Sequence, residues 1–348
     1  MAGGVGSRFW PFSRTNFPKQ FHDVLGTGRS LLQQTVDRFA NICPLENIYI
    51  VTNASYKQLV LEQLPFLKEE QVLLEVVGKN TAPCIAYAAY KIRTKNADAN
   101  IVIAPSDHII LKESEYERRL TIALTESAEK DVLVTLGIKP SRPDTGYGYI
   151  RFEQGNNEAH HVLNFTEKPQ LEIAKAFVSS GEYVWNAGIF IFRAATIINA
   201  FEKFEPTLAQ EFAEGINKYY TPEEQEFVDG VYHKTKNISI DYAVMERAEN
   251  VFVVLSDIGW SDLGTWKSLY EIKDKDENNN VLDGNIVTYD TKDCIIKTPS
   301  ERLVVTQGLE GYIVAEYDNV LMICKKDEEQ KVKEFVTDLK AKNAKEYV

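Results

Sequence analysis

Short apolar runs alternate with longer amphipathic stretches along most of this chain. The runs are rich in branched side chains, which is typical of buried strands, and the stretches repeat their apolar positions at helical spacing. The predicted strands cover residues 48–52, 73–77 and 101–104, and the predicted helices cover residues 56–67 and 82–93. Strands that alternate with helices of this length predict an α/β fold with a mixed, mostly parallel sheet covered on both faces. Ligands of such sheets bind beyond the carboxyl ends of the strands.

The pattern changes after a polar, turn-prone segment at residues 274–280. Five short β-rich runs then follow one another with turn residues between them, and no helical period fits among them. Similar units at close spacing predict a small β module, β-helix-like in its coiling. An amphipathic helix over residues 327–340 is expected to close the chain. We therefore predict two domains, residues 1–272 and residues 281–348.

The composition is that of an ordinary globular protein. Of the 348 residues, 44% are apolar and 26% are charged, and the net charge of -12 argues against a nucleic-acid-binding face. No apolar run reaches the roughly 18 residues that a membrane-spanning helix needs, and no signal-peptide pattern is present. The four cysteines are scattered without metal-type pairing. We expect a cytoplasmic protein with reduced thiols and with no nucleic-acid or membrane partner.

The chain begins with a glycine-rich segment that suits phosphate binding. Glycines allow backbone N–H groups to approach a phosphate, and Arg8 adds forked donors. A second basic residue, Lys19, follows in a proline-containing turn. The predicted nucleotide-binding residues of this segment are Ala2, Gly3, Gly4, Gly6, Ser7 and Arg8. A mobile tail is the alternative interpretation of such a segment.

A series of segments, in one order along the chain, resembles a known family. The segments are AGGVGSRFWPFSR with FPKQF, GKNTAP, PSDH, GYGYI, FTEKP, WNAG, SIDY and WSDLGTW. They are similar to the motifs of nucleotidylyltransferases that make nucleotide sugars, and above all to those of the mannose-1-phosphate guanylyltransferase branch. The resemblance implies a Rossmann-like nucleotide-diphospho-sugar transferase domain, with the β module after it.

The resemblance also implies a reaction, in which GTP and mannose 1-phosphate give GDP-mannose and pyrophosphate with the help of Mg²⁺. An oxygen of the sugar phosphate would attack the α-phosphorus in line. The second pKa of a phosphate monoester is about 6, so the nucleophile is largely ionised at neutral pH and needs no general base. The site then has to bring anions together and neutralise the leaving group, which suits carboxylates, lysine and arginine.

The family pattern assigns the metal and the phosphates to four residues. Asp107 and Asp262 would hold Mg²⁺, because this ion prefers oxygen ligands and keeps waters and phosphate oxygens in its shell. Arg8 and Lys19 would contact the β- and γ-phosphates. His108 is interpreted as a hydrogen-bonding residue, since Mg²⁺ selects oxygen over imidazole. A turn or helix-cap role is the alternative for each aspartate.

Three further residues complete the predicted nucleotide site. Asn80 and Thr81 open a predicted helix, and the resemblance implies that they read the base edge. A plain helix cap is the competing interpretation of this pair. Ser106 precedes the first metal-binding aspartate and is assigned to the nucleotide as well.

The family pattern places the sugar phosphate on a second group of residues: Gly146, Glu167, Lys168, Asn186 and Asp241. Lys168 would meet the phosphate, and Glu167, Asn186 and the backbone near Gly146 would take sugar hydroxyls. The segment around Asp241 also fits the start of a helix capped by Ser239, so this assignment has an alternative.

Histidine and tryptophan residues near these motifs are interpreted as structural. His160 and His161 lie in a polar, hairpin-like stretch and are expected to be solvated. Four tryptophans flank motifs and are expected to pack loops rather than to stack on a base: Trp10, Trp185, Trp260 and Trp266.

The start of the chain departs from the family pattern. Family members carry a short apolar strand before the glycine loop, whereas this sequence begins at Met1 where that strand would end. We expect Met1 to be an internal residue of a longer native chain or a misassigned start. Some relatives carry a cupin-type isomerase domain, and we expect no phosphomannose isomerase activity here.

Several other functions compete with the preferred one. The same chemistry could act on another sugar 1-phosphate, or the chain could be a non-catalytic regulatory subunit that binds a nucleotide sugar. A dinucleotide-binding oxidoreductase is disfavoured because Phe9 stands where G-x-G-x-x-G requires its third glycine. The β module and the terminal helix are candidate surfaces of a homodimer.

Overall fold

The chain divides into two compact units, neither of which is contiguous in sequence. The computed structural model describes residues 1–348 apart from the side chain of Lys345. The first unit comprises residues 1–3, 35–106 and 110–260, and the second comprises residues 4–34, 107–109 and 261–348. Three short elements lie where the chain passes from one unit to the other: α1 (Leu31–Asp37), β4 (Ile109–Ile110) and β10 (Trp260–Ser261).

The first unit is built on a mixed six-stranded sheet with the order β3-β8-β5-β9-β7-β6. Its strands are β3 (Asn100–Ile103), β5 (Leu133–Ile138), β6 (Tyr149–Phe152), β7 (Ala159–Thr166), β8 (Tyr183–Arg193) and β9 (Val251–Leu255). The long strand β8 runs antiparallel to β3, β5 and β6, and β5 pairs in parallel with β9. The α/β class and the mixed sheet are confirmed, but the expectation of a mostly parallel sheet is wrong, because both β8 and β7 run antiparallel to their neighbours.

A separate parallel pair, β1 (Ile50–Asn53) and β2 (Val72–Glu75), lies next to the first residues of the chain. The Ala2 N–H donates to the Val51 carbonyl at 2.7 Å, and the Ser106 N–H donates to the Met1 carbonyl at 3.0 Å. The amino group of Met1 donates to the Ala104 carbonyl at 2.9 Å. Residues 1 and 2 are therefore bonded to β1 on one side and to the segment after β3 on the other.

Helices cover both faces of the six-stranded sheet. Successive apolar residues of β8 point to opposite faces, so both faces have to be buried. Ile189 and Ile191 pack in the cluster that contains α4 (Glu113–Glu129). Phe190 and Phe192 pack in the opposite cluster, with α3 (Thr81–Lys95) and α6 (Ala194–Phe204). Burial of each such side chain contributes about 1.5–3 kcal/mol. The unit also contains the α-helices α2 (Lys57–Gln63), α5 (Leu171–Ser180), α7 (Pro206–Ala213) and α8 (Glu224–Lys234), and a π-helical turn at Asp241–Met245.

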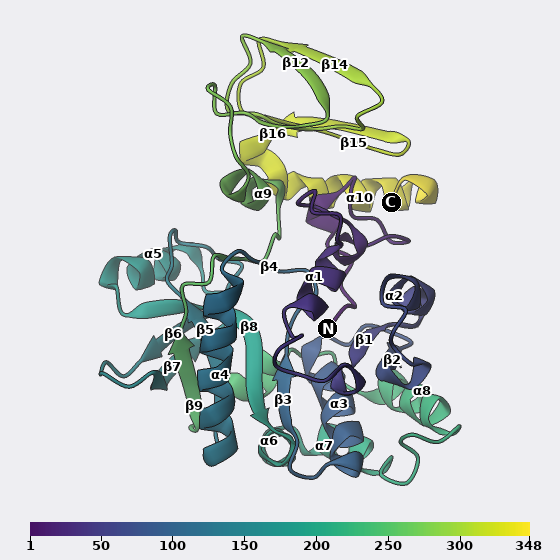
Figure 1. Ribbon diagram of the computed structural model, residues 1–348, viewed down its shortest axis with the longest axis vertical. Coiled ribbons are helices and arrows are strands. Elements are labelled where there is room, and N and C mark those ends of the chain that lie inside the picture. The colour runs from purple at the N-terminus through teal and green to yellow at the C-terminus, as the bar shows by residue number, and fades with distance from the viewer. The chain divides into compact units, whose positions relative to one another are not determined.

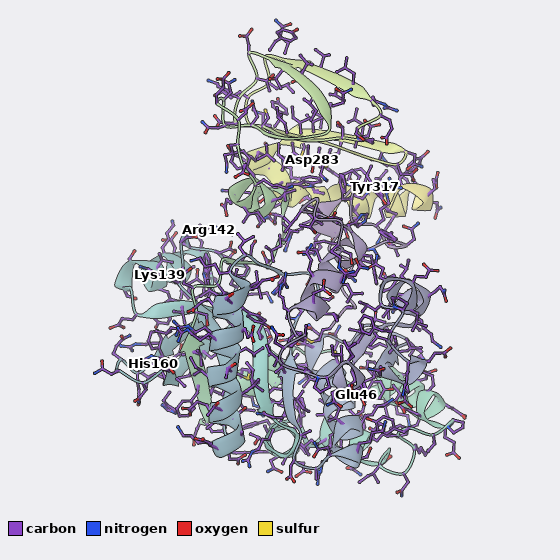
Figure 2. All side chains as sticks on the ribbon, viewed as in Figure 1. Glu46, Lys139, Arg142, His160, Asp283 and Tyr317 are labelled. Carbon is purple, nitrogen blue, oxygen red and sulfur yellow. The ribbon has the colours of Figure 1, made fainter. Side chains whose placement is uncertain are left out.

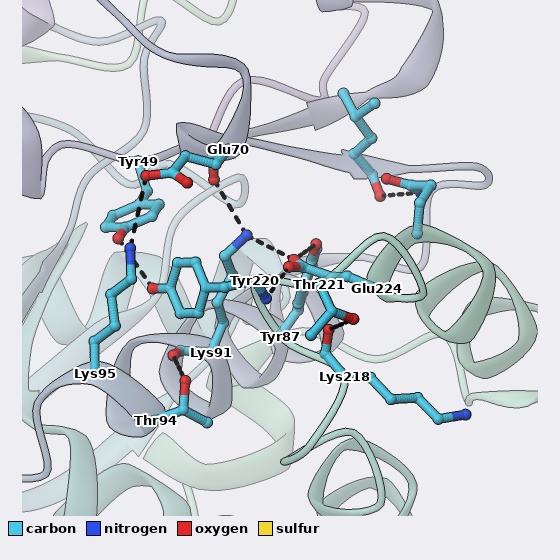
Figure 3. A network of polar contacts seen from close by, with 12 residues as sticks. Tyr49, Glu70, Tyr87, Lys91, Thr94, Lys95, Lys218, Tyr220, Thr221 and Glu224 are labelled. Carbon is cyan, nitrogen blue, oxygen red and sulfur yellow. Dashed lines mark hydrogen bonds and ion pairs between the residues drawn. The ribbon is translucent and has the colours of Figure 1, made fainter.

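A buried polar network fixes α3 against α8 (Figure 3). The Lys91 ammonium lies 2.6 Å from Glu224 Oε1, and the Tyr87 hydroxyl donates to the same oxygen at 2.5 Å. The other carboxylate oxygen of Glu224 accepts the Tyr220 N–H at 2.6 Å. Because the buried charges are paired and hydrogen-bonded, they hold the helix that carries the predicted Asn80–Thr81 pair at its start.

The second unit contains the predicted β module. Its strands are β11 (Val281–Asp283), β12 (Asn285–Tyr289), β13 (Ile295–Lys297), β14 (Leu303–Gln307), β15 (Tyr312–Tyr317) and β16 (Val320–Lys325). β11, β13 and β15 pair in parallel in one sheet, β12 and β14 pair in parallel in another, and β16 adds an antiparallel edge (Figure 1). Successive parallel pairings in two sheets make a short β-helix, as predicted.

Two helices and the N-terminal segment pack with the module. These helices are α9 (Trp266–Ile272) and α10 (Val332–Ala341). α10 is the helix expected to close the chain, and a 3₁₀ stretch over Lys326–Lys331 precedes it. Phe9 stacks on Trp266 with ring centroids 4.5 Å apart. The Trp10 indole donates to the Tyr347 carbonyl at 2.6 Å, and Arg14 donates to the carbonyl of Tyr317, labelled in Figure 2, at 2.8 Å.

These contacts explain why the compact units differ from the predicted domain boundary at residues 272–281. The hydrophobic cluster of the second unit joins Phe9 and Trp10 to Leu269, Ile313 and Val336. Residues 4–34 therefore belong to the same compact unit as the β module, although they stand at the other end of the sequence.

One of the two histidines expected in solvent is buried. His160, on β7, is 8% exposed, and its Nδ1 lies 2.9 Å from the Glu153 carbonyl. The prediction for His160 was wrong because the polar residues around it belong to a strand pair that turns this side chain inwards, where it packs against Phe152. Among the described residues, no helix is long and apolar enough to cross a membrane.

Candidate active site

The glycine-rich segment forms a loop that is hydrogen-bonded to other residues of the second unit. Gly6 has a φ of 64°, a left-handed conformation that glycine adopts without the strain of a Cβ. The Ser13 hydroxyl donates to the Val5 carbonyl, and the Gln20 amide donates to the Gly4 carbonyl at 3.1 Å. The mobile-tail interpretation is therefore wrong: the loop leads into a 3₁₀ turn at Ser7–Phe9 whose last residue is fully buried.

Lys19 joins the two predicted metal-binding segments. Its side chain is 3% exposed, and its ammonium lies 3.0 Å from Asp107 Oδ2. The same nitrogen donates to the carbonyls of Asp262, at 2.9 Å, and Leu263, at 3.0 Å. An ammonium has three N–H donors, so these three acceptors use all of them and leave none for the β- and γ-phosphates that the family pattern assigns to Lys19.

This arrangement sets the protonation of Asp107. Burial opposes ionisation of the carboxyl, but attraction to Lys19 and to His108 outweighs burial and lowers the pKa of Asp107 below its ordinary value. Asp107 follows β3, at the carboxyl end of a strand as predicted. It is therefore a carboxylate at neutral pH.

The turn that carries Asp262 is tightly constrained. Leu263 has a φ of 46°, and the Gly264 N–H donates to Asp262 Oδ1 at 3.0 Å. A Cβ on Gly264 would lie 2.5 Å from Asp262 Oδ2. Only glycine leaves room for the carboxylate at this position, so the DLG sequence fixes the direction in which Asp262 points.

These residues line a cleft of about 310 Å³ in the second unit. Its lining residues are Gly6, Ser7, Arg8, Lys19, Asp107, His108, Asp262, Gly264 and Lys333. The Arg8 side chain is exposed, and within the described part of the chain its guanidinium has no hydrogen bond or ion pair. An unpaired guanidinium beside a glycine loop suits a phosphate group.

The donor set of the cleft fits Mg²⁺. The cleft presents two carboxylates, Asp107 and Asp262, and Mg²⁺ typically binds one or two carboxylates together with substrate phosphates and water. No group of three or more His, Cys, Asp or Glu side chains that could hold a metal occurs among the residues described.

The residues predicted to read the base lie in the first unit, with helix-cap geometry. Asn80 has a φ of 70°, and its side chain accepts the Thr81 N–H at 2.9 Å as the N-cap of α3. The Thr81 hydroxyl accepts the Ile240 N–H at 2.9 Å. The cap that the sequence offered as the alternative is thus present, and Thr81 also ties α3 to the segment before Asp241.

Ser106 differs from these capped residues. The residue is 3% exposed, and in the described chain its hydroxyl has no hydrogen-bond partner. A buried hydroxyl without a partner is costly, which is expected where a ligand supplies the missing bond.

A second polar cluster in the first unit brings together four of the five residues predicted for the sugar phosphate, all except Gly146. Lys168 Nζ lies 2.5 Å from Glu167 Oε1, and Asn186 Nδ2 donates to Asp241 Oδ1 at 3.0 Å. Lys168 has a φ of 46°, a strained conformation held just before Pro169. The Gly146 N–H is bonded to Asp144 Oδ1 at 2.8 Å and so belongs to a turn of its own.

Two carboxylates of this cluster share the cation Lys168. Burial raises the pKa of Asp241, repulsion from Glu167 raises it further, and Lys168 offsets only part of this, so that it reaches about 7. Burial disfavours the charge on Lys168, but its bond to Glu167 outweighs burial and raises the pKa of Lys168. The cluster therefore carries excess negative charge when all of its groups are ionised.

Two residues that sequence reasoning missed shape this cluster. The Thr135 hydroxyl lies 2.9 Å from Asn186 Oδ1 and orients the amide. A Cβ on Gly148 would lie 2.6 Å from Glu167 Oε2 and 3.4 Å from Asn186 Cβ. The GYGY sequence held a signal for Gly148, whereas Thr135 looks like any threonine in a strand.

The tryptophans near the motifs pack loops, as predicted. The Trp266 indole donates to the Trp10 carbonyl at 3.0 Å inside the second unit. In the first unit the Tyr147 ring packs edge-on against both Trp185 and Trp260.

Comparison with known proteins identifies the family of this chain. The family model described as Nucleotidyl transferase matches residues 1–279, and the model described as MannoseP isomerase/GMP-like beta-helix domain matches residues 284–339. Mannose-1-phosphate guanylyltransferase of Salmonella montevideo is 38% identical over 363 residues, which cover 100% of this chain and 74% of that protein. The Klebsiella pneumoniae protein of the same name is 35% identical over 356 residues, with the same coverage of 100% and 74%.

One solved structure is also similar to this chain over nearly its full length. The Thermus thermophilus protein named mannose-1-phosphate geranyltransferase superposes with a TM-score of 0.88 at 32% identity, over 98% of each chain. The chain therefore belongs to the nucleotidyl transferase family, in its mannose-1-phosphate guanylyltransferase branch.

Proposed function

We propose that this enzyme makes GDP-mannose and pyrophosphate from GTP and mannose 1-phosphate. The observation that carries the proposal is the cleft in which Arg8, Lys19, Asp107 and Asp262 meet. A catalytically silent subunit would be expected to have lost some of these four residues, and all four are present. The identity of the substrates is supported by the names of the relatives, which span all of this chain.

In this proposal the cleft binds the triphosphate. Arg8 has free donors for phosphate oxygens, and the glycine loop allows a close approach of backbone N–H groups. Lys19 neutralises Asp107 and holds the turn of Asp262 through its carbonyl contacts. Asp107 and Asp262 would hold a magnesium ion, which when bound supplies positive charge to the phosphates.

The polar cluster of the first unit binds the sugar phosphate in this proposal. Lys168 offsets part of the negative charge of Glu167 and Asp241, and its ammonium would contact the phosphate. The carboxylates and the Asn186 amide would accept and donate hydrogen bonds with sugar hydroxyls. Asn80 and Thr81 remain the predicted base-reading pair, and Ser106 offers its hydroxyl, unpaired within the described chain, to the nucleotide.

Pyrophosphate release tests this function directly. The full chain is assayed with Mg²⁺ while GTP, ATP, UTP and dTTP are crossed with the 1-phosphates of mannose, glucose and fucose. We expect release with GTP and mannose 1-phosphate. Release with another pair would keep the chemistry and correct the substrates. A folded chain that releases no pyrophosphate with any pair would contradict the proposal and favour a binding subunit.

We also propose that the protein is a homodimer that associates through β12 and β14. These parallel strands place Val287 beside Val305 on an exposed face, and Leu303 and Tyr289 extend the face with exposures of 56% and 58%. An apolar face of this kind is typical of association surfaces. Light scattering after gel filtration should give twice the chain mass for the wild type and for the control Leu45→Glu, and a monomer for Val305→Glu. A wild-type monomer would contradict the proposal.

A cytoplasmic location completes the proposal. All four cysteines, Cys43, Cys84, Cys294 and Cys324, are free thiols. Free thiols are usual in a reducing compartment. Fractionation of the native cells should place the protein with cytoplasmic markers.

A further inference from the structure

A lysine of the closing helix lines the cleft together with the glycine loop. Lys333 is in the first turn of α10, and it borders the same cleft as Ser7, Arg8 and Asp262. Figure 1 shows α10, in yellow, running beside the N-terminal segment of its own unit, in purple, and the helix contacts the Ser7–Phe9 turn. No motif of the sequence singled this residue out.

The position of Lys333 is fixed by the packing of its neighbours. Val332 is fully buried and Val336 is 6% exposed, and both belong to the core of the second unit together with Phe9. The backbone that carries Lys333 is thus held on the opposite side by apolar contacts. Its long side chain remains exposed.

An anionic ligand in the cleft would be able to pair with the ammonium of Lys333. Lys19 is committed to Asp107 and to two backbone carbonyls, so its donors are already used. Within the described chain, the ammonium of Lys333 has no hydrogen bond or ion pair, like the guanidinium of Arg8. A nucleoside triphosphate carries several negative charges, and its leaving pyrophosphate needs positive charge around it.

We infer that Lys333 is a phosphate-binding residue of the cleft, which contacts the terminal phosphates of the bound nucleotide and the pyrophosphate that leaves. The inference rests on the proposed function, because it takes the cleft as the triphosphate site. It gives the C-terminal module a direct part in substrate binding. With Arg8, Lys333 supplies positive charge that the described residues leave unpaired.

Direct binding of pyrophosphate tests the inference without depending on the sugar or the base. Isothermal titration with inorganic pyrophosphate and Mg²⁺ is done on the full chain and on Lys333→Ala, Lys333→Arg and Lys340→Ala. Lys340 belongs to the same helix and does not line the cleft, so it is the matched control. Circular dichroism and thermal melts establish that each variant is folded.

A charge-assisted contact of this kind corresponds to a loss of roughly tenfold in affinity. Lys333→Ala should therefore bind pyrophosphate about tenfold more weakly, while Lys340→Ala stays within twofold of the wild type and Lys333→Arg recovers most of the loss. Lys333→Ala within twofold of the wild type, or an equal loss in Lys340→Ala, would overturn the inference.

A kinetic comparison separates this inference from the proposed function. With whichever substrate pair the wild type uses, Lys333→Ala should raise the KM for the nucleoside triphosphate and leave the KM for the sugar phosphate unchanged. An equal rise in both would overturn the role of Lys333. Failure of the proposed substrates would show instead as a wild type that is inactive with GTP and mannose 1-phosphate, while the pyrophosphate titration would still decide the role of Lys333.

Discussion

The cleft of the second unit and the polar cluster of the first unit have opposite electrostatic designs. In the cleft, Lys19 is buried and bonded to Asp107, while Arg8 is exposed and unpaired within the described residues. In the polar cluster, Glu167 and Asp241 share the cation Lys168, and the pKa of Asp241 is raised to about 7. The cleft therefore has unpaired cations, whereas the polar cluster has more carboxylates than cations.

The difference indicates how one enzyme can handle two anionic substrates. A triphosphate is mostly negative charge, and the unpaired cations of the cleft suit it. A sugar phosphate is mostly hydroxyl donors with one anionic group, which suits several acceptors around one lysine. The unequal supply of charge therefore favours a different substrate in each region.

Removing the carboxylate of Asp107 should have the largest effect. Asp107→Asn should lower the turnover of pyrophosphate release by roughly 10³-fold with Mg²⁺, because the cleft would lose one of the two carboxylates that we propose hold the metal. The fold should survive, since Lys19 keeps its two carbonyl acceptors. The matched control is Asp257→Asn, an exposed carboxylate paired with Lys112. Turnover within a few-fold of the wild type would refute the metal role.

A change in the polar cluster should act on the sugar phosphate alone. In Gly148→Ala the new methyl group would stand 2.6 Å from Glu167 Oε2, so the carboxylate has to move. We expect the KM for the sugar phosphate to rise roughly 10- to 100-fold and the KM for the nucleotide to stay unchanged. Gly155→Ala is the control, because a Cβ there meets nothing within 4 Å. An unchanged KM for the sugar phosphate would remove Glu167 from this site.

The raised pKa of Asp241 predicts a smaller, pH-dependent effect on stability. Between the ordinary pKa of an aspartate, about 4, and the folded value of about 7, the folded chain binds a proton that the unfolded chain has lost. The free energy of unfolding should therefore fall as the pH rises through this window, by roughly 1–2 kcal/mol after allowance for partial solvent exposure. Urea titrations at pH 5 and pH 7.5 measure the change.

Asp241→Asn isolates the contribution of this carboxyl. The asparagine cannot ionise, so the variant should lose the roughly 1–2 kcal/mol fall between the two pH values while other groups keep theirs. If the wild type and the variant change by the same amount, Asp241 does not titrate in this window.

The sequence predicts the fold where local pattern decides it. The apolar runs identify β1, β2 and β3 to within a few residues, and the β-rich runs identify the module. The direction of β8 could not be predicted, because this strand is buried on both faces and its continuous apolar run does not show which way it runs beside its neighbours. The packing of residues 4–34 with the module could not be predicted either. It depends on contacts between residues more than 250 positions apart, such as Trp10 and Trp266.

In the site, too, some residues can be identified from the sequence and others only from the folded structure. Motifs with unusual residues, such as the Asp107 and Asp262 segments, stand out in the sequence. Thr135 acts through a single hydrogen bond to Asn186, and Lys333 is one exposed lysine among many. Their neighbours come from distant parts of the chain, so only the folded structure reveals what they can contact.

The most direct test of the account compares the steady-state kinetics of Arg8→Ala and Lys168→Ala with those of the wild type. Arg8→Ala should raise the KM for GTP roughly tenfold or more and leave the KM for mannose 1-phosphate near its original value. Lys168→Ala should do the reverse, and both variants should melt like the wild type. Equal changes in both KM values in either variant would contradict the assignment of the two anions to two separately charged regions.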